Sequence, residues 1–208
     1  MRLARWIPVV ILLSIVLVAG CNRLQKAPET GQGKLAATAY MNNGKAVEVI
    51  VDVRASRIAG NNEYLPLHLA VHNRLNDELV LNREDLVLEL ADGTRLPLAS
   101  YEEFEKDHRR HRIDIRIGND FIETLGSRYP APPFQWRDLE FFPAMDSGTV
   151  PRTEIELRKA QIAVGLIYFR IPEGSALAGA GEATLLLNAS HTGETYVVDV
   201  QAYKKPKS

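Results

Sequence analysis

Short segments in which apolar and polar residues alternate run through most of this chain. Apolar residues occupy every second position in residues 47–53 and again in residues 65–71. Because successive side chains of a β-strand point to opposite faces, each segment predicts a strand with one buried face. The opposite faces carry polar residues such as Glu48, Asp52 and His68. Each strand is therefore expected to bury one face only.

Further alternating segments continue this pattern and are separated by turn residues. They comprise residues 79–81, 86–90, 95–98, 167–171, 185–187 and 196–200. Asp92 and Gly93 stand between two of them, and Asp-Gly in that position is a strong hairpin signal. A chain of about seven or eight short strands predicts a mostly β protein built as an antiparallel β-sandwich. The side chains expected inside are Val49, Val51, Leu67, Leu69, Leu86, Leu88, Ile167, Phe169, Leu187 and Val198.

Residues 100–160 interrupt this rhythm and are expected to form an irregular, partly helical insertion. Residues 101–116 are dense in charge, and pairs such as Glu102 with Lys106 have the i, i+4 spacing of helical ion pairs. This spacing predicts a short surface helix that runs into an alternating segment at residues 113–117.

Proline and aromatic residues are concentrated between residues 128 and 151, where regular central strands are not expected. Proline fixes the backbone, and aromatic side chains on a preorganised segment lose little entropy on binding. The hypothesis is therefore that a partner binds the aromatic residues Tyr129, Phe134, Trp136, Phe141 and Phe142. The alternative is that Phe134, Trp136, Phe141 and Phe142 cap an open end of the sandwich, since aromatic residues bury well.

Several short motifs follow one another along the predicted strands. They are Val71-His72-Asn73, residues 79–81, Asp85-Leu86-Val87-Leu88, Asp92-Gly93, residues 165–172 and Leu185-Leu186-Leu187. This order resembles the immunoglobulin-like domains of unknown function in bacterial surface lipoproteins. In those domains a strand ending in asparagine precedes a hairpin, and a later strand ends in proline. The resemblance covers residues 60–98 and 160–201 and implies a β-sandwich with no catalytic residue to transfer.

Residues 1–20 have the order of charged and apolar residues that an export signal requires. Arg2 and Arg5 precede an apolar run at residues 7–20, which is shorter than the roughly 20 residues that span a bilayer as a helix. The pattern therefore predicts a cleaved signal peptide and not a permanent transmembrane helix.

Small residues then precede the single cysteine of the chain, in Leu17-Val18-Ala19-Gly20-Cys21. This ending resembles the lipobox of bacterial lipoprotein signals, which implies cleavage before Cys21 and lipidation of that residue. Several acyl chains hold a protein on a membrane firmly, because each buried methylene contributes about 0.8 kcal/mol. Asn22 follows in place of an aspartate, so the resemblance favours the outer membrane, facing the periplasm, in a Gram-negative host. The alternative is an ordinary secretory signal in which Cys21 is incidental.

Composition divides the rest of the chain into a tether, a domain and a tail. Residues 21–44 combine glycine and proline with polar residues and predict a lipidated, flexible tether. Residues 45–203 suit one sandwich domain with its insertion. Residues 204–208, with three lysines, form a basic tail.

The charge balance excludes some classes of function. The formal net charge is −1, and the loss of Arg2 and Arg5 with the signal makes the rest more acidic. Nucleic acid is not an expected partner, since its binding requires a basic stripe. With Cys21 acylated, no thiol remains for a disulfide or a thiolate metal site, and no cofactor is expected.

Four histidines are candidate metal ligands. His68 and His72 lie on one face of a strand but about 13 Å apart, too far to share an ion without strand curvature. His108 and His111 have a spacing that one helix face accommodates, but the arginines around them would repel a cation. No metal site is expected, and a periplasmic metal carrier is an alternative function.

Two catalytic arrangements were also considered. The candidate acids and bases of a hydrolase are Glu102, Glu103, Glu105 and Asp107, whose neighbouring lysine and arginines favour a solvated charged helix. Ser190 beside His191 has no glycine elbow around the serine. The leading hypothesis is a membrane-anchored, non-enzymatic binding or scaffold module at the cell envelope, with an envelope protein as partner. An envelope hydrolase is the other alternative.

Overall fold

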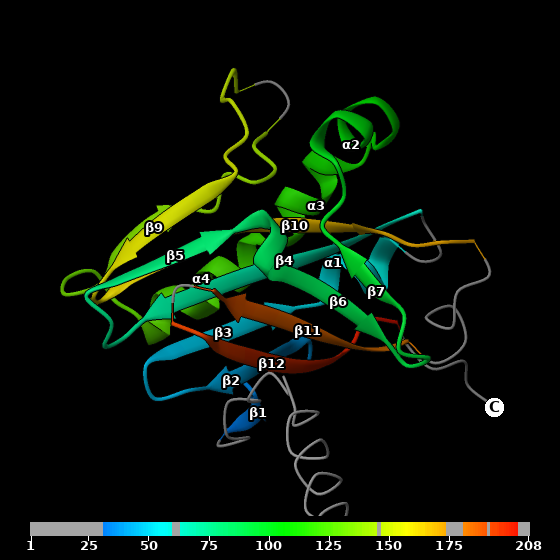
Figure 1. The fold of residues 1–208 in the computed structure, drawn as a ribbon. Coiled ribbons are helices and arrows are strands. Elements are labelled where there is room, and N and C mark those ends of the chain that lie inside the picture. Colours follow the sequence, from blue (N-terminus) through cyan, green and yellow to red (C-terminus); the bar gives the residue numbers. More distant parts are fainter. Residues whose placement is uncertain (1–30, 60–62, 145–146, 174–180, 191, 204–208) are drawn as a thin grey trace, which may run out of the picture.

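Strands dominate the protein, and helices cover one side of it (Figure 1). The structure is a computed structural model that describes residues 31–59, 63–144, 147–173, 181–190 and 192–203. Within these residues, 12 strands form sheets of six, four and two strands. The protein is therefore mostly β, as the alternating sequence pattern predicts.

The largest sheet has six strands and contains one parallel pair. Its strands, in spatial order, are β1 (Gln32–Lys34), β2 (Ala39–Asn43), β3 (Val47–Asp52), β4 (Tyr64–Asn73), β10 (Gln161–Arg170) and β8 (Gln135–Asp138). All neighbours are antiparallel except β8 and β10, which run parallel with Trp136 opposite Ile162. The prediction of a purely antiparallel arrangement is wrong at this edge. A parallel pair needs a long connection, which the insertion provides.

The second sheet has four strands and contains the predicted hairpin. In spatial order it comprises β12 (Glu194–Gln201), β11 (Glu182–Ala189), β6 (Leu86–Leu90) and β7 (Arg95–Pro97). Gly93, in the turn between β6 and β7, has a φ of 84°, which glycine adopts without strain. This confirms the hairpin predicted from Asp92-Gly93. The remaining sheet pairs β5 (Glu78–Asn82) with β9 (Glu154–Arg158), and a 3-10 helix, η1 (Arg83–Asp85), links β5 to β6.

One apolar core fills the space between the six-stranded and four-stranded sheets. The ten side chains predicted to lie inside are all buried in it: Val49, Val51, Leu67, Leu69, Leu86, Leu88, Ile167, Phe169, Leu187 and Val198. The two sheets also meet at their edges. The Asn42 side chain donates a hydrogen bond to the carbonyl of Val197 at 2.8 Å, and Leu98 forms an isolated bridge with Phe169.

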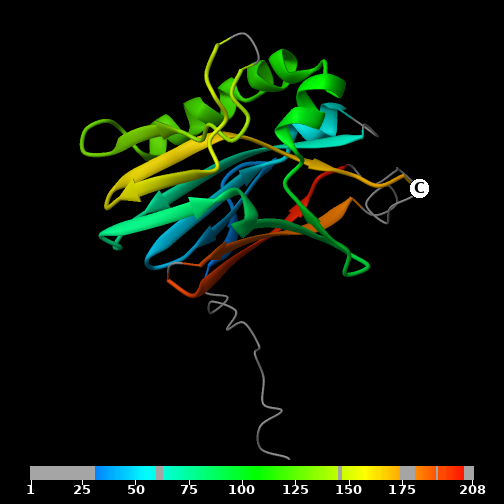
Figure 2. The ribbon, with the colours of Figure 1, turned by 45° about the horizontal axis from the view of Figure 1, so that its top comes forward.

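A layer of helices covers the outer face of the six-stranded sheet. The helices are α1 (Arg54–Ala59), α2 (Tyr101–Asp107), α3 (His111–Ile117) and α4 (Asn119–Arg128). Figure 2 shows α2 to α4 as a row on the side of this sheet away from the four-stranded sheet. Phe121 and Leu125 of α4 pack there against Ile50, Ala70 and Val164 in a second apolar cluster. We call α1 to α4 the helical layer.

The helical layer corrects two sequence predictions. Every residue of β3 and β4 is buried, so these strands bury both faces and not one. Residues 113–117 alternate in sequence but lie in α3, and the single surface helix predicted over residues 101–116 is two helices, α2 and α3. Alternation of apolar residues over so short a segment does not distinguish a helix from a strand.

The prediction of a flexible tether over residues 21–44 is wrong for its described part, which contains two strands. Within residues 21–44, β1 and β2 join the edge of the six-stranded sheet, with Tyr40 of β2 opposite Val51 of β3. Residues 1–30, including the predicted signal peptide and Cys21, lie outside the described residues, as does the basic tail. Among the helices that the structure describes, none is long and apolar enough to cross a membrane.

Candidate functional site

Between the six-stranded sheet and the helical layer lies a set of buried polar side chains. We call it the polar layer. Its members that are less than one-tenth exposed are Glu48, Asp52, His68, His72, His108, His111 and Asp114. Buried groups of this kind require hydrogen-bond or charge partners, so their contacts decide what the layer does.

Glu48 on β3 is the centre of the first group. Its side chain is fully buried, and its two carboxylate oxygens accept hydrogen bonds from Arg128 and Arg74, each at 2.6 Å. The Tyr129 hydroxyl also donates to this carboxylate, and Nδ1 of His72 lies 3.7 Å away. Arg74 follows β4 and Arg128 ends α4, so Glu48 joins the sheet to the helical layer.

The charge state of Glu48 follows from these contacts. Burial by itself would raise the pKa of the carboxyl group, because the charged form loses water. The contact with His72, the hydrogen bonds from Tyr129 and Arg128 and the charge of Arg74 outweigh that effect and lower the pKa to about 2. Burial and the hydrogen bond to Glu48 raise the pKa of the Tyr129 hydroxyl to about 12. Glu48 is therefore ionised, and Tyr129 remains its hydrogen-bond donor, across the physiological range.

A second group surrounds Asp114 of α3. His108 Nε2 lies 2.8 Å from Asp114 Oδ2, and the Tyr168 hydroxyl donates to the same oxygen at 3.2 Å. Phe104 stacks on His108 with a centroid distance of 5.0 Å and contacts Tyr168 at 4.3 Å. Burial, followed by the charge of Asp114, raises the pKa of Tyr168 well above its usual value. The hydroxyl of Tyr168 thus stays protonated as a donor.

His68 lies between these groups and fits closely beneath the helical layer. A Cβ atom placed on Gly118 would lie 1.9 Å from His68 Nε2, so only glycine allows the α3–α4 junction to approach the ring. Burial lowers the pKa of His68 to about 4, against the charges of Asp52 and Asp114, which raise it. His68 is therefore a neutral ring at physiological pH.

The polar layer holds the helical layer on the sheet. Asp114 and His108 have the pairing of a catalytic dyad, but their side chains are 0% and 5% exposed, so a substrate does not reach them in this conformation. Glu48 is equally enclosed, although Arg74 and Arg128 are 27% and 33% exposed. The geometry therefore supports a structural role, in which charged hydrogen bonds fix the position of the helices.

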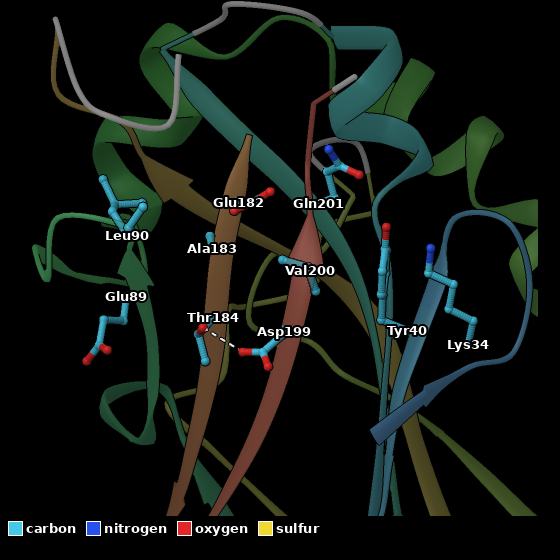
Figure 3. A pocket seen from close by; sticks show the side chains of 11 residues that line it. Lys34, Tyr40, Glu89, Leu90, Glu182, Ala183, Thr184, Asp199, Val200 and Gln201 are labelled. Atoms are coloured by element: carbon cyan, nitrogen blue, oxygen red, sulfur yellow. Dashed lines mark hydrogen bonds between the residues drawn. The ribbon is translucent and has the colours of Figure 1, made fainter. Parts of the chain in front are cut away.

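The open side of the four-stranded sheet carries a groove of about 470 Å³ (Figure 3). Its polar lining comprises Glu89, Glu182, Thr184, Asp199 and Gln201 from the four-stranded sheet, with Lys34 and Tyr40 from β1 and β2. We call it the acidic groove. A smaller hollow of about 170 Å³ lies beside β8 and β9 and is lined by Trp136, Asp138 and Arg152 among others.

The five aromatic residues predicted to bind a partner separate into two sets. Tyr129, Phe141 and Phe142 are 4%, 0% and 4% exposed and belong to the apolar clusters, so burial removes them from any partner surface in this conformation. Phe134 and Trp136 pack against the second apolar cluster and keep part of their surface exposed. The burial of Phe141 and Phe142 agrees with the alternative that they cap an open end of the sandwich, because a capping side chain is buried against the elements it covers.

The other candidates considered in the sequence do not assemble into one site. The four acidic residues Glu102, Glu103, Glu105 and Asp107 are exposed on α2. Ser190 donates a hydrogen bond to Asp85, and His191 lies outside the described residues. Across the described part of the chain, no group of three or more His, Cys, Asp or Glu side chains is placed to hold a metal ion.

The sequence reasoning did not identify the polar layer as a unit. Glu48 and Asp52 were assigned to an exposed strand face, and no signal in the local pattern pairs Glu48 with Arg74 or Arg128. Charged residues on strands of a sheet that is covered on both sides indicate a buried polar layer. The sequence does not show that this sheet is covered on both sides, because that depends on the position of the helices.

Comparisons with known proteins add little to this geometry. No family model matches the chain, and no curated protein is significantly similar to it. Among solved structures, the yjhA protein from Bacillus subtilis aligns with 85% of this chain and 97% of its own, at 11% identity and a TM-score of 0.35. A likeness this weak carries no argument about fold or function.

Proposed function

We propose that this chain is a bacterial envelope lipoprotein, cut before Cys21, anchored by lipid on that residue and acting as a non-enzymatic binding or scaffold module. The lipobox-like sequence before Cys21 supports the anchor, and Asn22 supports the outer membrane, facing the periplasm, in a Gram-negative host. The observation that carries the binding role is the position of β1 relative to the helical layer.

β1 is the first described strand, and it forms the edge of the six-stranded sheet beside β12. The Gln32 side chain donates to the carbonyl of Val197 at 3.4 Å. Helices α2 to α4 lie on the other side of the molecule (Figures 1 and 2), whereas α1 contacts β2 through the hydrogen bond from Arg57 to the Tyr40 hydroxyl at 2.9 Å. A domain anchored through the residues before β1 turns its helical layer away from the membrane, where it is accessible to other envelope proteins.

The sandwich is proposed to be of the immunoglobulin-like kind. Two facing sheets with a shared core, the β6–β7 hairpin and the return of β11 beside β6 support this assignment. Strand β8 and helices α2 to α4 are additions within the insertion. The fold by itself does not select a function, because sandwiches serve many.

The proposed partner surface lies on the helical layer and the adjoining edge strand β8. Phe134 and Trp136 keep part of their surface open there, and large apolar side chains on α3 and α4 are also exposed. Ile113, Ile115 and Ile122 are 46%, 38% and 42% exposed. Apolar and aromatic side chains exposed on rigid elements are typical anchors of protein interfaces.

Photo-crosslinking in the native cells tests this function. A photoreactive residue at Ile122 or Trp136 is expected to capture an envelope protein, and one at Thr94, in the β6–β7 hairpin, serves as the matched exposed control. The variant Trp136→Ala should reduce capture at Ile122 with little loss of stability. Phe141→Ala, by contrast, should lower the free energy of unfolding by about 3–5 kcal/mol. Equal capture from Thr94 and Ile122, or capture unchanged by Trp136→Ala, would contradict the proposed surface.

A further inference from the structure

His68 lies at the boundary between the six-stranded sheet and helices α3 and α4. It belongs to β4, opposite Asp52 of β3 on one side and Leu166 of β10 on the other. His68 is 4% exposed, and its ring lies against Gly118 and against Phe121, whose ring centroid is 6.1 Å away. Among the residues that the structure describes, none forms a hydrogen bond with Nδ1 of this ring. The ring is therefore enclosed by both layers and held by neither through that atom.

The charged groups around His68 do not offset its burial. Burial dominates and lowers the pKa of His68 to about 4, although the carboxylates of Asp52 on β3 and Asp114 on α3 act in the opposite direction. Arg54 of α1 lowers the pKa further, and it pairs with Asp120 of α4. The residue opposite on β10 and the neighbours on the same face of β4, at positions 66 and 70, are uncharged.

This burial ties the contact between the sheet and α3 and α4 to the pH. If the two helices lift from the sheet, His68 regains water and its ordinary pKa of 6.5. Because the closed form has the lower pKa, its stabilisation is complete above about pH 6.5 and is lost as the pH falls toward 4. From pH 7 to pH 5 the ratio of open to closed molecules should rise about 20-fold. Glu48 changes little in this interval, since its pKa lies between 4.5 and about 2.

Helices α3 and α4 stand outside the main core (Figure 2). None of residues 111–128, all of which the structure describes, belongs to the apolar core between the two large sheets. The buried side chains of α3 are His111 and Asp114, and α4 buries Phe121 and Leu125 in the smaller second cluster. Segments with few buried apolar contacts open at a lower free energy than the core of the same protein. These two helices can therefore open while the sheets stay folded.

We propose that His68 is an acid-sensitive latch, whose protonation releases α3 and α4 from the six-stranded sheet while both large sheets remain folded. The released form exposes Phe121 and Leu125, which are buried in the closed form, beside Ile122, which is already 42% exposed. Acid thereby enlarges the apolar surface of α4. The latch depends on neither the lipid anchor nor the proposed partner.

Hydrogen exchange of the full chain in neutral detergent, followed by mass spectrometry, tests the latch. Exchange rates divided by the intrinsic rates at each pH give the opening constant, which is the ratio of open to closed molecules. For the amides of α4 this constant should rise about 20-fold from pH 7 to pH 5. The amides of β11 should keep an opening constant at least about tenfold smaller at both pH values, because they open only with the main core. An α4 constant that does not change with pH, or one equal to that of β11, overturns the proposal.

The variant His68→Gln assigns the effect to this ring. Glutamine does not titrate, so the opening constant of α4 should change less than about twofold between pH 7 and pH 5. His72→Gln is the matched control, since His72 is also buried and lies on the same face of β4, and this variant should keep the rise. A rise that persists in His68→Gln, or that is lost in His72→Gln, overturns the proposal.

A nuclear magnetic resonance titration of the parent chain gives the answer even if His68→Gln does not fold. The ring of His68 is expected to stay neutral until the pH falls below about 6, because protonation requires α3 and α4 to open or the buried ring to accept a charge. A midpoint below about 6 supports the latch. A midpoint at the ordinary value for histidine would show that the ring titrates freely in the closed form, which overturns the proposal.

Discussion

The substitution Glu48→Gln tests the role of the polar layer most sharply. It keeps the shape of the side chain but removes the charge that two arginines and Tyr129 share. The amide oxygen still accepts on one side, but the amide nitrogen on the other side donates and cannot accept, so one arginine loses its acceptor. Arg74 and Arg128 then face each other without a counter-charge. The free energy of unfolding should fall, because a half-removed buried ion pair leaves uncompensated charge.

The magnitude follows from the pKa of Glu48. Its pKa is lowered from 4.5 to about 2, and one pKa unit corresponds to about 1.4 kcal/mol, so the native contacts stabilise the ionised form by about 3 kcal/mol. Both arginines are about one-third exposed, so water can hydrate them in the variant. The loss in free energy of unfolding therefore stays at about 3 kcal/mol, below that for a fully enclosed ion pair. Because the native pKa lies below the unfolded one, this stabilisation is complete above about pH 4.5 and disappears as the pH falls toward 2.

Urea unfolding followed by circular dichroism measures this difference for the parent chain and the variant at several pH values. At pH 7, Glu48→Gln should be about 3 kcal/mol less stable, and the two proteins should converge as the pH falls below 4.5. Glu89→Gln is the matched control, since Glu89 pairs with one arginine at the surface and should cost less than about 1 kcal/mol. Free energies of unfolding that differ by less than about 0.5 kcal/mol at pH 7, which is about the error of the measurement, would contradict the role of Glu48. A difference that stays constant with pH would also contradict it.

Three further substitutions test the packing of the layers by the same unfolding measurement. Gly118→Ala should destabilise by about 1–3 kcal/mol, because its Cβ would meet the ring of His68. Gly126→Ala, in the open part of α4, is the control and should be neutral or stabilising. A Gly118→Ala variant as stable as the parent would contradict the close contact. Leu88→Ala should cost about 2–5 kcal/mol as a fully buried core residue, and a cost below 1 kcal/mol would remove it from the core. Asp114→Asn should cost about 1–3 kcal/mol by weakening two buried hydrogen bonds, and an unchanged midpoint would show that they contribute nothing.

The interior between the two main sheets could be predicted from the sequence. Alternating positions such as Val49, Leu67 and Ile167 identify it because their burial depends only on the two-residue period of a strand. The turn at Gly93 was equally predictable, since its positive φ is a local requirement. Local physical rules therefore sufficed for these elements.

The helical layer and the polar layer could not be predicted in the same way. Glu48 is buried because α4, about 70 residues later in the sequence, covers it, and no local pattern carries that information. The isoleucines at 113, 115 and 117 suit a strand or a helix equally, and in the structure they lie in α3, whose buried side chains are His111 and Asp114. The aromatic segment was identified by composition, but the burial of Phe141 and the exposure of part of Trp136 depend on which elements surround them.

Mass spectrometry of the protein purified from its own membranes tests the central proposal most directly. We predict that the mature chain begins at Cys21, that this residue carries diacylglycerol and an amino-terminal acyl group, and that Cys21→Ser abolishes both the lipid and membrane retention. A mature chain that retains residues 1–20, or one that begins elsewhere with an unmodified Cys21, would contradict it.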